Sequence, residues 1–299
     1  MRDLARKYYK YRVELLMLLP AFLFLFGFLV IIFQCLVKLS FTYVGSDYTE
    51  QFPSLHNYLS VFNAGEFKNA FINTLLFVIV GTPLELVAGL VLALVIYRVF
   101  VLRGLVRSIF IIPLAIPAMV TAIILYILFD YPNGHVNNLL MGKYAIFPAL
   151  LSEPINWRSS AVSSLGISLV GKVWRDMPIS MLILLAGLNS ITRDQYDAAE
   201  TMGARERQKF MYITLPLLLP AISTVLVIRS IEMWKEFIFP YFLARRFRLL
   251  GTLIEELYHD WNRGGDAAVV ALILVLSIVA CTVLLYWALK RTRLFLVKV

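Results

Sequence analysis

The residues that could do chemistry lie where a membrane helix would ordinarily be apolar. Arg229, Glu232 and Glu236 follow a long run of apolar residues. At about 100° per residue of α-helix, the three side chains fall within roughly 60° of one another on one face. Two interpretations stay open. Either Arg229 and Glu232 form an ion pair that only lowers the cost of burial, or the stripe lines a path for a polar solute.

Two tryptophans favour the second interpretation, because indole rings can stack on the faces of sugar rings. Trp234 lies within the charged stripe, and Trp174 lies in another apolar segment beside Lys172, Arg175 and Asp176. We therefore take the following as a candidate substrate pathway: Arg229, Glu232, Glu236, Trp234 and Trp174.

One phosphate-loop pattern occurs, and it fails at its last position. Residues Gly166 to Val173 read GISLVGKV, but Val173 stands where a Mg²⁺-binding Ser or Thr should follow Lys172. The three histidines are isolated from one another and from the cysteines, so no metal site is expected. No nucleophile or paired carboxylates stand out, which predicts a chain that is not an enzyme and binds no cofactor itself.

The elements that must position these residues are membrane helices. Of 299 residues, 60% are hydrophobic and 16% charged, with a mean hydropathy of +0.79. A helix of about 20 residues crosses a bilayer, so we predict an all-α membrane protein with six spans. The six predicted segments are Leu15 to Val37, Ala70 to Tyr97, Ser108 to Phe129, Ile167 to Asn189, Ile213 to Pro240 and Ala267 to Leu289. Glu85 is the one charge of the second.

The distribution of Lys and Arg predicts that both termini face the cytoplasm. The two tails and the connections after the second and fourth spans hold sixteen Lys and Arg residues, against eight in the other three connections. The last outer connection runs against this rule with four arginines, including Arg245, Arg246 and Arg248. We interpret that connection as facing a partner rather than lipid.

The connection between the fourth and fifth spans has the marks of a short helix. Thr192 is placed to cap it, with Gln195 three residues on as in a capping box. Asp194 suits the positive end of the helix dipole, and Gly203 stands where a left-handed stop belongs.

This short helix should carry an apolar stripe, because Tyr196, Ala199 and Met202 recur at helical spacing. Two partners for the stripe stay open. One is the membrane or the chain's own spans, and the other is a separate protein.

The sequence DAAETMGA, followed by ITLPLLLP, resembles the EAA loop of ATP-binding-cassette importer permeases. Asp197 stands for the first acid of that motif. In that family the loop is a coupling helix that docks in a cleft of the ATPase subunit. The resemblance implies that the following residues couple to an ATPase: Tyr196, Asp197, Ala198, Ala199, Glu200, Met202, Gly203 and Ala204.

Further stretches resemble sugar permeases of the maltose type, among them HNYLSVF, RGLVRSIFIIPLAIPAMV and KVWRDMPISMLILLAGLNSI. The resemblance implies a type I importer permease working with a homologous permease, two ATPase subunits that bind ATP and Mg²⁺, and an external solute-binding protein. It divides the chain into a cytoplasmic tail 1–14, a six-span domain 15–290 with the coupling loop 191–214, and a tail 291–299.

Other functions stay open at this point. The permease could carry glycerol phosphate or another polar solute in place of a sugar. An ion-coupled secondary transporter would use Glu85 and Glu232 as proton carriers. A membrane scaffold would have no transport path. The excess of nine positive charges is assigned to topology and anionic lipid, with no nucleic-acid partner.

The charge distribution yields a test of orientation. Single cysteines at Asn138 and Asn262 should react with an impermeant thiol reagent added outside intact cells, and one at Gln208 should not. Labelling of Gln208→Cys from outside would reverse the predicted topology.

Overall fold

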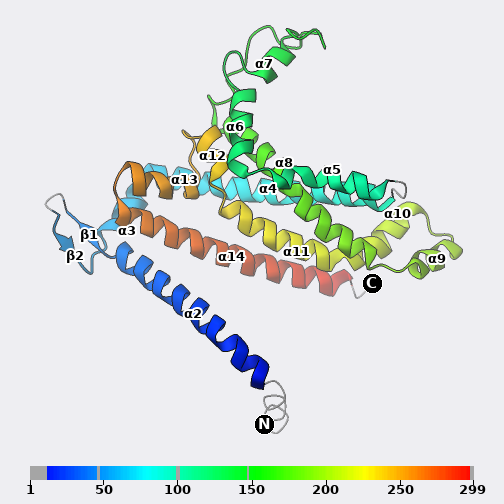
Figure 1. The fold of residues 1–299 in the computed structure, drawn as a ribbon, viewed down its shortest axis with the longest axis horizontal. Helices are drawn as coiled ribbons and strands as arrows, with labels where there is room; N and C mark the ends of the chain where they lie inside the picture. Colours follow the sequence, from blue (N-terminus) through cyan, green and yellow to red (C-terminus); the bar gives the residue numbers. More distant parts are fainter. Residues whose placement is uncertain (1–11, 46–47, 99–101, 147, 297–299) are drawn as a thin grey trace.

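A computed structural model describes residues 12–45, 48–98, 102–146 and 148–296. Its long helices are α2 (Arg12–Ser40), α4 (Gly65–Arg98), α8 (Ala161–Asn189), α11 (Leu215–Trp234) and α14 (Gly264–Leu296). Helices α4, α8, α11 and α14 run alongside one another as a bundle, and α2 diverges from it at an angle (Figure 1).

Shorter elements connect the long helices. They are β1 (Tyr43–Val44), β2 (Glu50–Gln51), α3 (His56–Asn63), α5 (Arg103–Ala115), α6 (Ala118–Leu128), α7 (His135–Leu140), α9 (Arg193–Thr201), α10 (Glu206–Lys209), a π-helical turn η1 (Phe210–Thr214), α12 (Ile238–Leu243), α13 (Leu250–Glu255) and a second π-helical turn η2 (Glu256–Asp260). Strands β1 and β2 pair antiparallel beside α3.

The predicted membrane helices are present, and their ends differ from the prediction. Helix α2 begins inside the predicted tail 1–14, and α14 continues through the predicted tail 291–299 as far as Leu296. Residues 1–11 and 297–299 of those two tails lie outside the described part of the chain.

Length and composition alone identify fewer spans than the six predicted. Four helices of the described residues are long and apolar enough to cross a membrane, and the bent pair of α5 and α6 would be a fifth. Helix α8 has 29 residues, or about 43 Å at 1.5 Å per residue, but it carries Lys172, Arg175 and Asp176. Helix α8 can be a sixth span only if it crosses the membrane with these charges paired to opposite charges. The number of six spans therefore stays a prediction.

The segment predicted as one clean span, Ser108 to Phe129, is broken. Helices α5 and α6 meet at an angle of 86°, and α6 leaves the bundle almost at right angles (Figure 1). Ile116 is extended at φ −82° and ψ 128°, because the ring of Pro117 disfavours the helical conformation of the residue before it. The bend therefore follows from a local proline signal that the prediction did not use.

The fifth predicted span, Ile213 to Pro240, also ends early. Helix α11 stops at Trp234, and a new helix, α12, begins at Ile238. In one continuous helix the ring of Pro240 would clash with the carbonyl of Glu236, whereas in the first turn of α12 it replaces no helical hydrogen bond. Glu236 consequently lies beyond the helix, and the predicted common face with Arg229 and Glu232 does not extend to it.

Small residues allow the bundle helices to approach closely. A Cβ atom added to Gly89 of α4 would lie 2.5 Å from Cβ of Ser180 and 3.0 Å from the backbone nitrogen of Met181, both in α8. Membrane helices associate through such packing, since lipid tails are as apolar as the helix surfaces. The contact between α4 and α8 therefore depends on a missing side chain at position 89.

Gly89→Ala should lower the melting temperature of the detergent-purified protein, because the new methyl group meets backbone and costs about 1–3 kcal/mol. Gly166→Ala in α8 is the matched control. No atom lies within 4 Å of its added Cβ, so this change should leave the melting temperature unchanged or raise it. Equal effects of the two changes would contradict the close contact.

Candidate functional site

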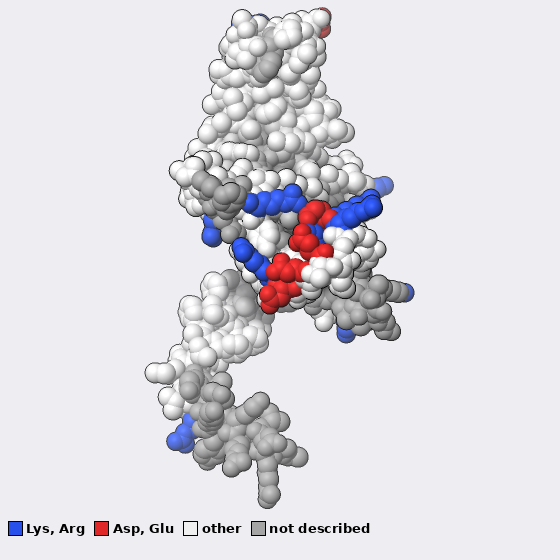
Figure 2. All heavy atoms as spheres, turned by 90° about the vertical axis from the view of Figure 1, so that its right-hand side faces the viewer, with Lys and Arg blue, Asp and Glu red and all other residues white. Residues whose placement is uncertain are grey.

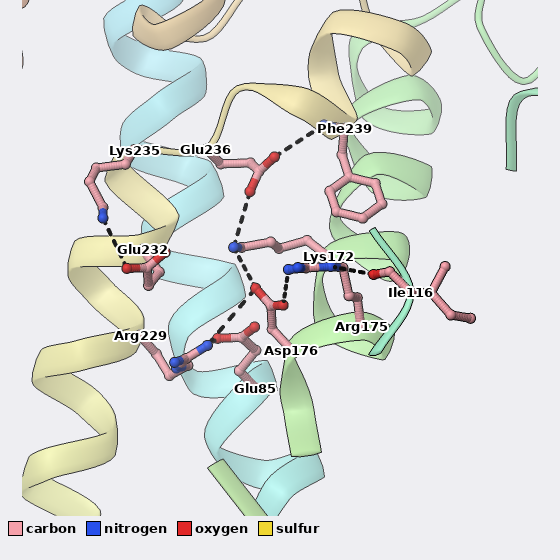
Figure 3. Close-up of polar contacts among 10 residues, drawn as sticks. All are labelled: Glu85, Ile116, Lys172, Arg175, Asp176, Arg229, Glu232, Lys235, Glu236 and Phe239. Atoms are coloured by element: carbon pink, nitrogen blue, oxygen red, sulfur yellow. Dashed lines mark hydrogen bonds and ion pairs between the residues drawn. The ribbon is translucent and has the colours of Figure 1, made fainter. Parts of the chain in front are cut away.

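A cluster of buried charges joins the helices of the bundle, and Lys172 of α8 lies near its centre (Figure 3). Its Nζ atom is 2.5 Å from Oδ2 of Asp176, one turn along the same helix, and 3.1 Å from Oε2 of Glu236. All three side chains are buried. Lys172 thus ties α8 to the segment between α11 and α12.

Arg175 links the same cluster to the bend between α5 and α6. Its Nη1 atom lies 2.6 Å from Oδ1 of Asp176, and its Nε atom donates to the carbonyl of Ile116 at 3.3 Å. Ile116 is the extended residue at the bend. The carbonyl of Ile116, which lies outside any helix, therefore accepts a hydrogen bond from the charged guanidinium of Arg175.

Arg229 of α11 lies between two carboxylates from the other two helices (Figure 3). Its Nε atom is 3.9 Å from Oε2 of Glu85 in α4, and its Nη1 atom is 3.9 Å from Oδ2 of Asp176. Both distances exceed a hydrogen bond. Within the described structure, neither carboxylate oxygen of the fully buried Glu85 has a hydrogen-bond partner, and nor does Nε of Arg229.

The six charges of this cluster balance. Its cations are Lys172, Arg175 and Arg229, and its anions are Glu85, Asp176 and Glu236. An isolated charge in a membrane interior costs several kcal/mol, and close partners reduce that cost. The arrangement contains no nucleophile and no open coordination site. Its chemistry is electrostatic, holding α4, α8 and α11 in register.

The structure separates the residues predicted to line a substrate pathway. Glu232 pairs with Lys235 at 2.9 Å on the exposed surface, and this partner differs from the one in the alternative that pairs Glu232 with Arg229. Trp234 is buried in the core beside Phe71, where its ring is covered, whereas Trp174 is 42% exposed. Of the predicted set, the charged cluster brings together Arg229 and Glu236.

The spacing of residues could not show the pairs of the cluster that join different helices. Glu85 precedes Arg229 by 144 positions, and no periodicity relates them. One available signal was the charge balance of the apolar segments. The phosphate-loop-like stretch lies inside α8, where its Lys172 is held by two carboxylates. Among the described residues, no group of three His, Cys, Asp or Glu side chains could hold a metal ion.

Helix α9 confirms the predicted short helix and its stop. Gly203 has φ +78°, and its N–H donates to the carbonyl of Glu200 at 2.9 Å. The N–H of Ala204 donates to the carbonyl of Ala199 at 2.9 Å, which completes the Schellman pair of bonds. At the other end Thr192 occupies the predicted N-cap position, but its side chain makes no capping hydrogen bond.

The predicted apolar stripe of α9 divides between two environments. Tyr196 is half-buried and Ala199 is 6% exposed, both against the chain itself, and the Tyr196 hydroxyl lies 2.9 Å from Oγ1 of Thr214. Met202 is 81% exposed. The expectation that Ala199 touches a separate subunit is therefore wrong for this conformation, because its methyl group faces its own chain.

The exposed side of α9 is polar and lies at one end of the molecule (Figure 1). Seen from that end, acidic side chains gather with basic side chains around them (Figure 2). The exposed residues of the predicted coupling set are Asp197, Ala198, Glu200, Met202 and Gly203. These side chains, and not the buried stripe, are available to another protein.

The family model for the binding-protein-dependent transport system inner membrane component matches residues 85–293. The chain belongs to this family. The match includes all six residues of the charged cluster together with α9. The chain is therefore a multi-pass inner-membrane permease of a binding-protein-dependent importer.

Several permeases are similar to this one in sequence. It is 32% identical over 233 residues to the trehalose/maltose transport system permease protein MalF of Thermococcus litoralis, covering 76% of this chain and 77% of that protein. It is 30% identical over 226 residues to the trehalose transport system permease protein SugA of Mycobacterium tuberculosis, covering 74% and 70%.

The fold of the permease matches that of a solved importer. A chain of a bacterial ABC transporter involved in the import of the acidic polysaccharide alginate superposes with a TM-score of 0.77 at 20% identity, over 97% of this chain and 99% of that one. The match confirms the predicted all-α importer permease fold.

Lys172→Met should lower the free energy of unfolding by about 3–5 kcal/mol, because it leaves Asp176 and Glu236 without a shared cation in the bundle. Denaturant unfolding in detergent measures the change. Adding Glu236→Gln should recover part of the loss. Lys235→Met, which removes an exposed pair, should cost less than about 1 kcal/mol. A cost for Lys172→Met no larger than that of Lys235→Met would contradict the structural role of the cluster.

Proposed function

We propose that this permease forms half of the transmembrane pathway of an ATP-driven importer for a saccharide. The names of its relatives support the substrate class, since they include trehalose/maltose, trehalose and sulfoquinovosyl glycerol transport permeases. The chain itself forms or breaks no bonds in its solute. Its part is to change which side of the membrane the pathway faces.

The observation that carries this proposal is the position of α9. The helix lies at one end of the molecule, exposes Asp197, Ala198 and Glu200, and ends in a fixed stop at Gly203. Tyr196 connects it to Thr214, at the end of the π-helical turn from which α11 continues. A partner that moves α9 would therefore move α11, and with it Arg229.

The remaining parts of the importer are separate chains in this proposal. Two ATPase subunits bind ATP and Mg²⁺ and receive the coupling helix in the cytoplasm, where both termini of the permease also lie. A homologous permease supplies the other half of the pathway, and a solute-binding protein delivers the saccharide outside. Helix α2 supports the permease partner and a lipid contact, since the apolar window of its span is 0% buried within this chain.

Within the permease, we assign the predicted pathway residues to different roles. Arg229 and Glu236 hold the helices together through the charged cluster. Trp234 packs in the core. Glu232 and Trp174 remain candidates for solute contact, since both are exposed on this chain.

The proposal is tested by Gly203→Val in the complete transporter, reconstituted with its receptor and ATPase subunits. A β-branched residue at φ +78° costs about 1–2 kcal/mol and should displace the stop of α9. Receptor-stimulated ATP hydrolysis and saccharide uptake should both fall, while the amount of permease in the membrane is unchanged.

Gly203→Asn is the matched control, because asparagine tolerates the left-handed conformation and no atom lies within 4 Å of an added Cβ. It should retain most of the coupling. Normal uptake by Gly203→Val would remove the coupling role of α9. Uptake by the wild-type permease without any ATPase subunit would instead identify an ion-coupled transporter.

A further inference from the structure

The basic segment between α12 and α13 is not explained by the fold or by the proposed function. Residues 244–248 read ARRFR, and its arginines lie on the predicted outer side, against the charge rule for membrane proteins. They lie far from α9 along the bundle (Figure 1). Topology gives no reason for this charge, so a local role must account for it.

The segment lines a cavity of about 460 Å³ together with α6 and the loop before α8. Its polar lining consists of Tyr126, Arg158, Tyr241, Arg245 and Arg246. A volume in this range is typical of sites for small ligands. Three guanidinium groups therefore meet in a cavity large enough for a sugar ring.

Two of these guanidinium groups are held in place by neighbours. Arg158 lies over the ring of Tyr126, with 3.9 Å to its centroid, and Nη2 of Arg158 is 2.6 Å from Oδ1 of Asp130. Arg245 lies 5.7 Å from the centroid of Tyr241 and pairs with Asp260 at 3.2 Å. Both positive charges are positioned and largely compensated by carboxylates.

Arg248 is compensated in the same way, on the other side of the segment. It lies over the ring of Trp261, 5.3 Å from the centroid, and its Nε atom bonds to the buried carboxylate of Glu256. It lines a different cavity, of about 350 Å³, to which Glu66 and Arg246 also contribute. A carboxylate in that lining disfavours an anion there.

Arg246 differs from its three neighbours. It is exposed, lies between the two cavities and contributes to the lining of both, and has no ion pair or hydrogen bond with the described residues. The hydroxyl groups of Tyr126 and Tyr241 in the 460 Å³ cavity also make no hydrogen bond with described residues. The four arginines face three carboxylates, those of Asp130, Asp260 and Glu256, so one positive charge is uncompensated. The two tyrosine hydroxyls are also without a hydrogen-bond partner among the described residues.

We infer that this cavity binds a saccharide carrying one acidic group, with the acidic group on Arg246 and sugar hydroxyls on Tyr126 and Tyr241. A guanidinium suits a carboxylate or sulfonate because it offers two parallel N–H donors. The inference rests on the proposed function, and it adds an entry site of defined charge at the outer end of the permease.

An acidic patch on the solute-binding protein is the competing occupant. The concave shape and the tyrosine hydroxyls favour a small ligand, since the rim charges of a protein docking surface are ordinarily solvent-exposed and spread over a wide area. The single uncompensated charge also matches a monoanion better than a cluster of carboxylates.

The test measures binding to the complete transporter in lipid nanodiscs, with methyl β-glucuronide as the probe and methyl β-glucoside as its neutral match. Titration followed by saturation-transfer NMR should show at least about tenfold tighter binding of the glucuronide, the size of one charge-assisted hydrogen bond. Arg246→Gln should abolish this preference, and Arg246→Lys should keep part of it.

Lys68→Gln is the matched control, because it removes an exposed positive charge from the start of α4 outside the cavity. It should leave the preference for the glucuronide intact. Tyr126→Phe should weaken the binding of both glycosides about equally, since it removes a hydroxyl partner and no charge.

Three results would overturn the inference. The first is an unchanged preference for the glucuronide in Arg246→Gln. The second is inorganic sulfate competing as well as methyl β-glucuronide, which would indicate a simple anion site. The third is a raised receptor concentration for half-maximal ATPase stimulation in Arg246→Gln without loss of glucuronide binding, which would indicate a receptor-docking surface.

A separate measurement, receptor stimulation of the ATPase, tests the proposed function. An importer whose ATPase no receptor stimulates would refute that proposal whatever the NMR titration shows. Normal stimulation together with no glucuronide preference refutes only the acidic-saccharide site.

Discussion

The structure depends on one electrostatic constraint: charges placed inside an apolar bundle must neutralise one another. Lys172 meets this constraint for both Asp176 and Glu236, and Arg229 approaches Glu85 and Asp176 at equal distances. The pair of Lys172 and Asp176 lies within α8, and the other three pairs join different combinations of α4, α8, α11 and the segment that follows α11. The positions of these elements are therefore coupled, since none can move far without leaving a buried charge less compensated.

This coupling connects the α9 end of the molecule with the bend between α5 and α6 through contacts that can be followed residue by residue. Helix α9 contacts Thr214 through Tyr196, α11 continues from there to Arg229, and Arg175 carries the cluster on to Ile116 at the bend. The π-helical turn η1 lies within this route. Such turns are frequent at functional sites.

The sequence predicted the features that depend on local chemistry. The length of the apolar segments predicted the long helices. Gly203 predicted the end of α9, because a glycine in the left-handed conformation ends a helix whatever packs around it. The bend at Ile116 and the end of α11 at Trp234 were also encoded locally, by Pro117 and Pro240, but an apolar span that contains proline can either kink or continue. The pairings of Glu85 and Lys172 could not be predicted, because they depend on how helices distant in sequence pack.

The partnership of Glu85 with Arg229 has a consequence for biogenesis. The 144 positions between them correspond to roughly 7 to 30 s of synthesis at ordinary elongation rates. During the later part of this interval α4 has left the ribosome while α11, which carries Arg229, is not yet complete. The insertion machinery must therefore retain α4, or α4 must enter lipid with its acid uncharged. A chain truncated before α11 would therefore leave Glu85 without the cation that approaches it in the finished bundle.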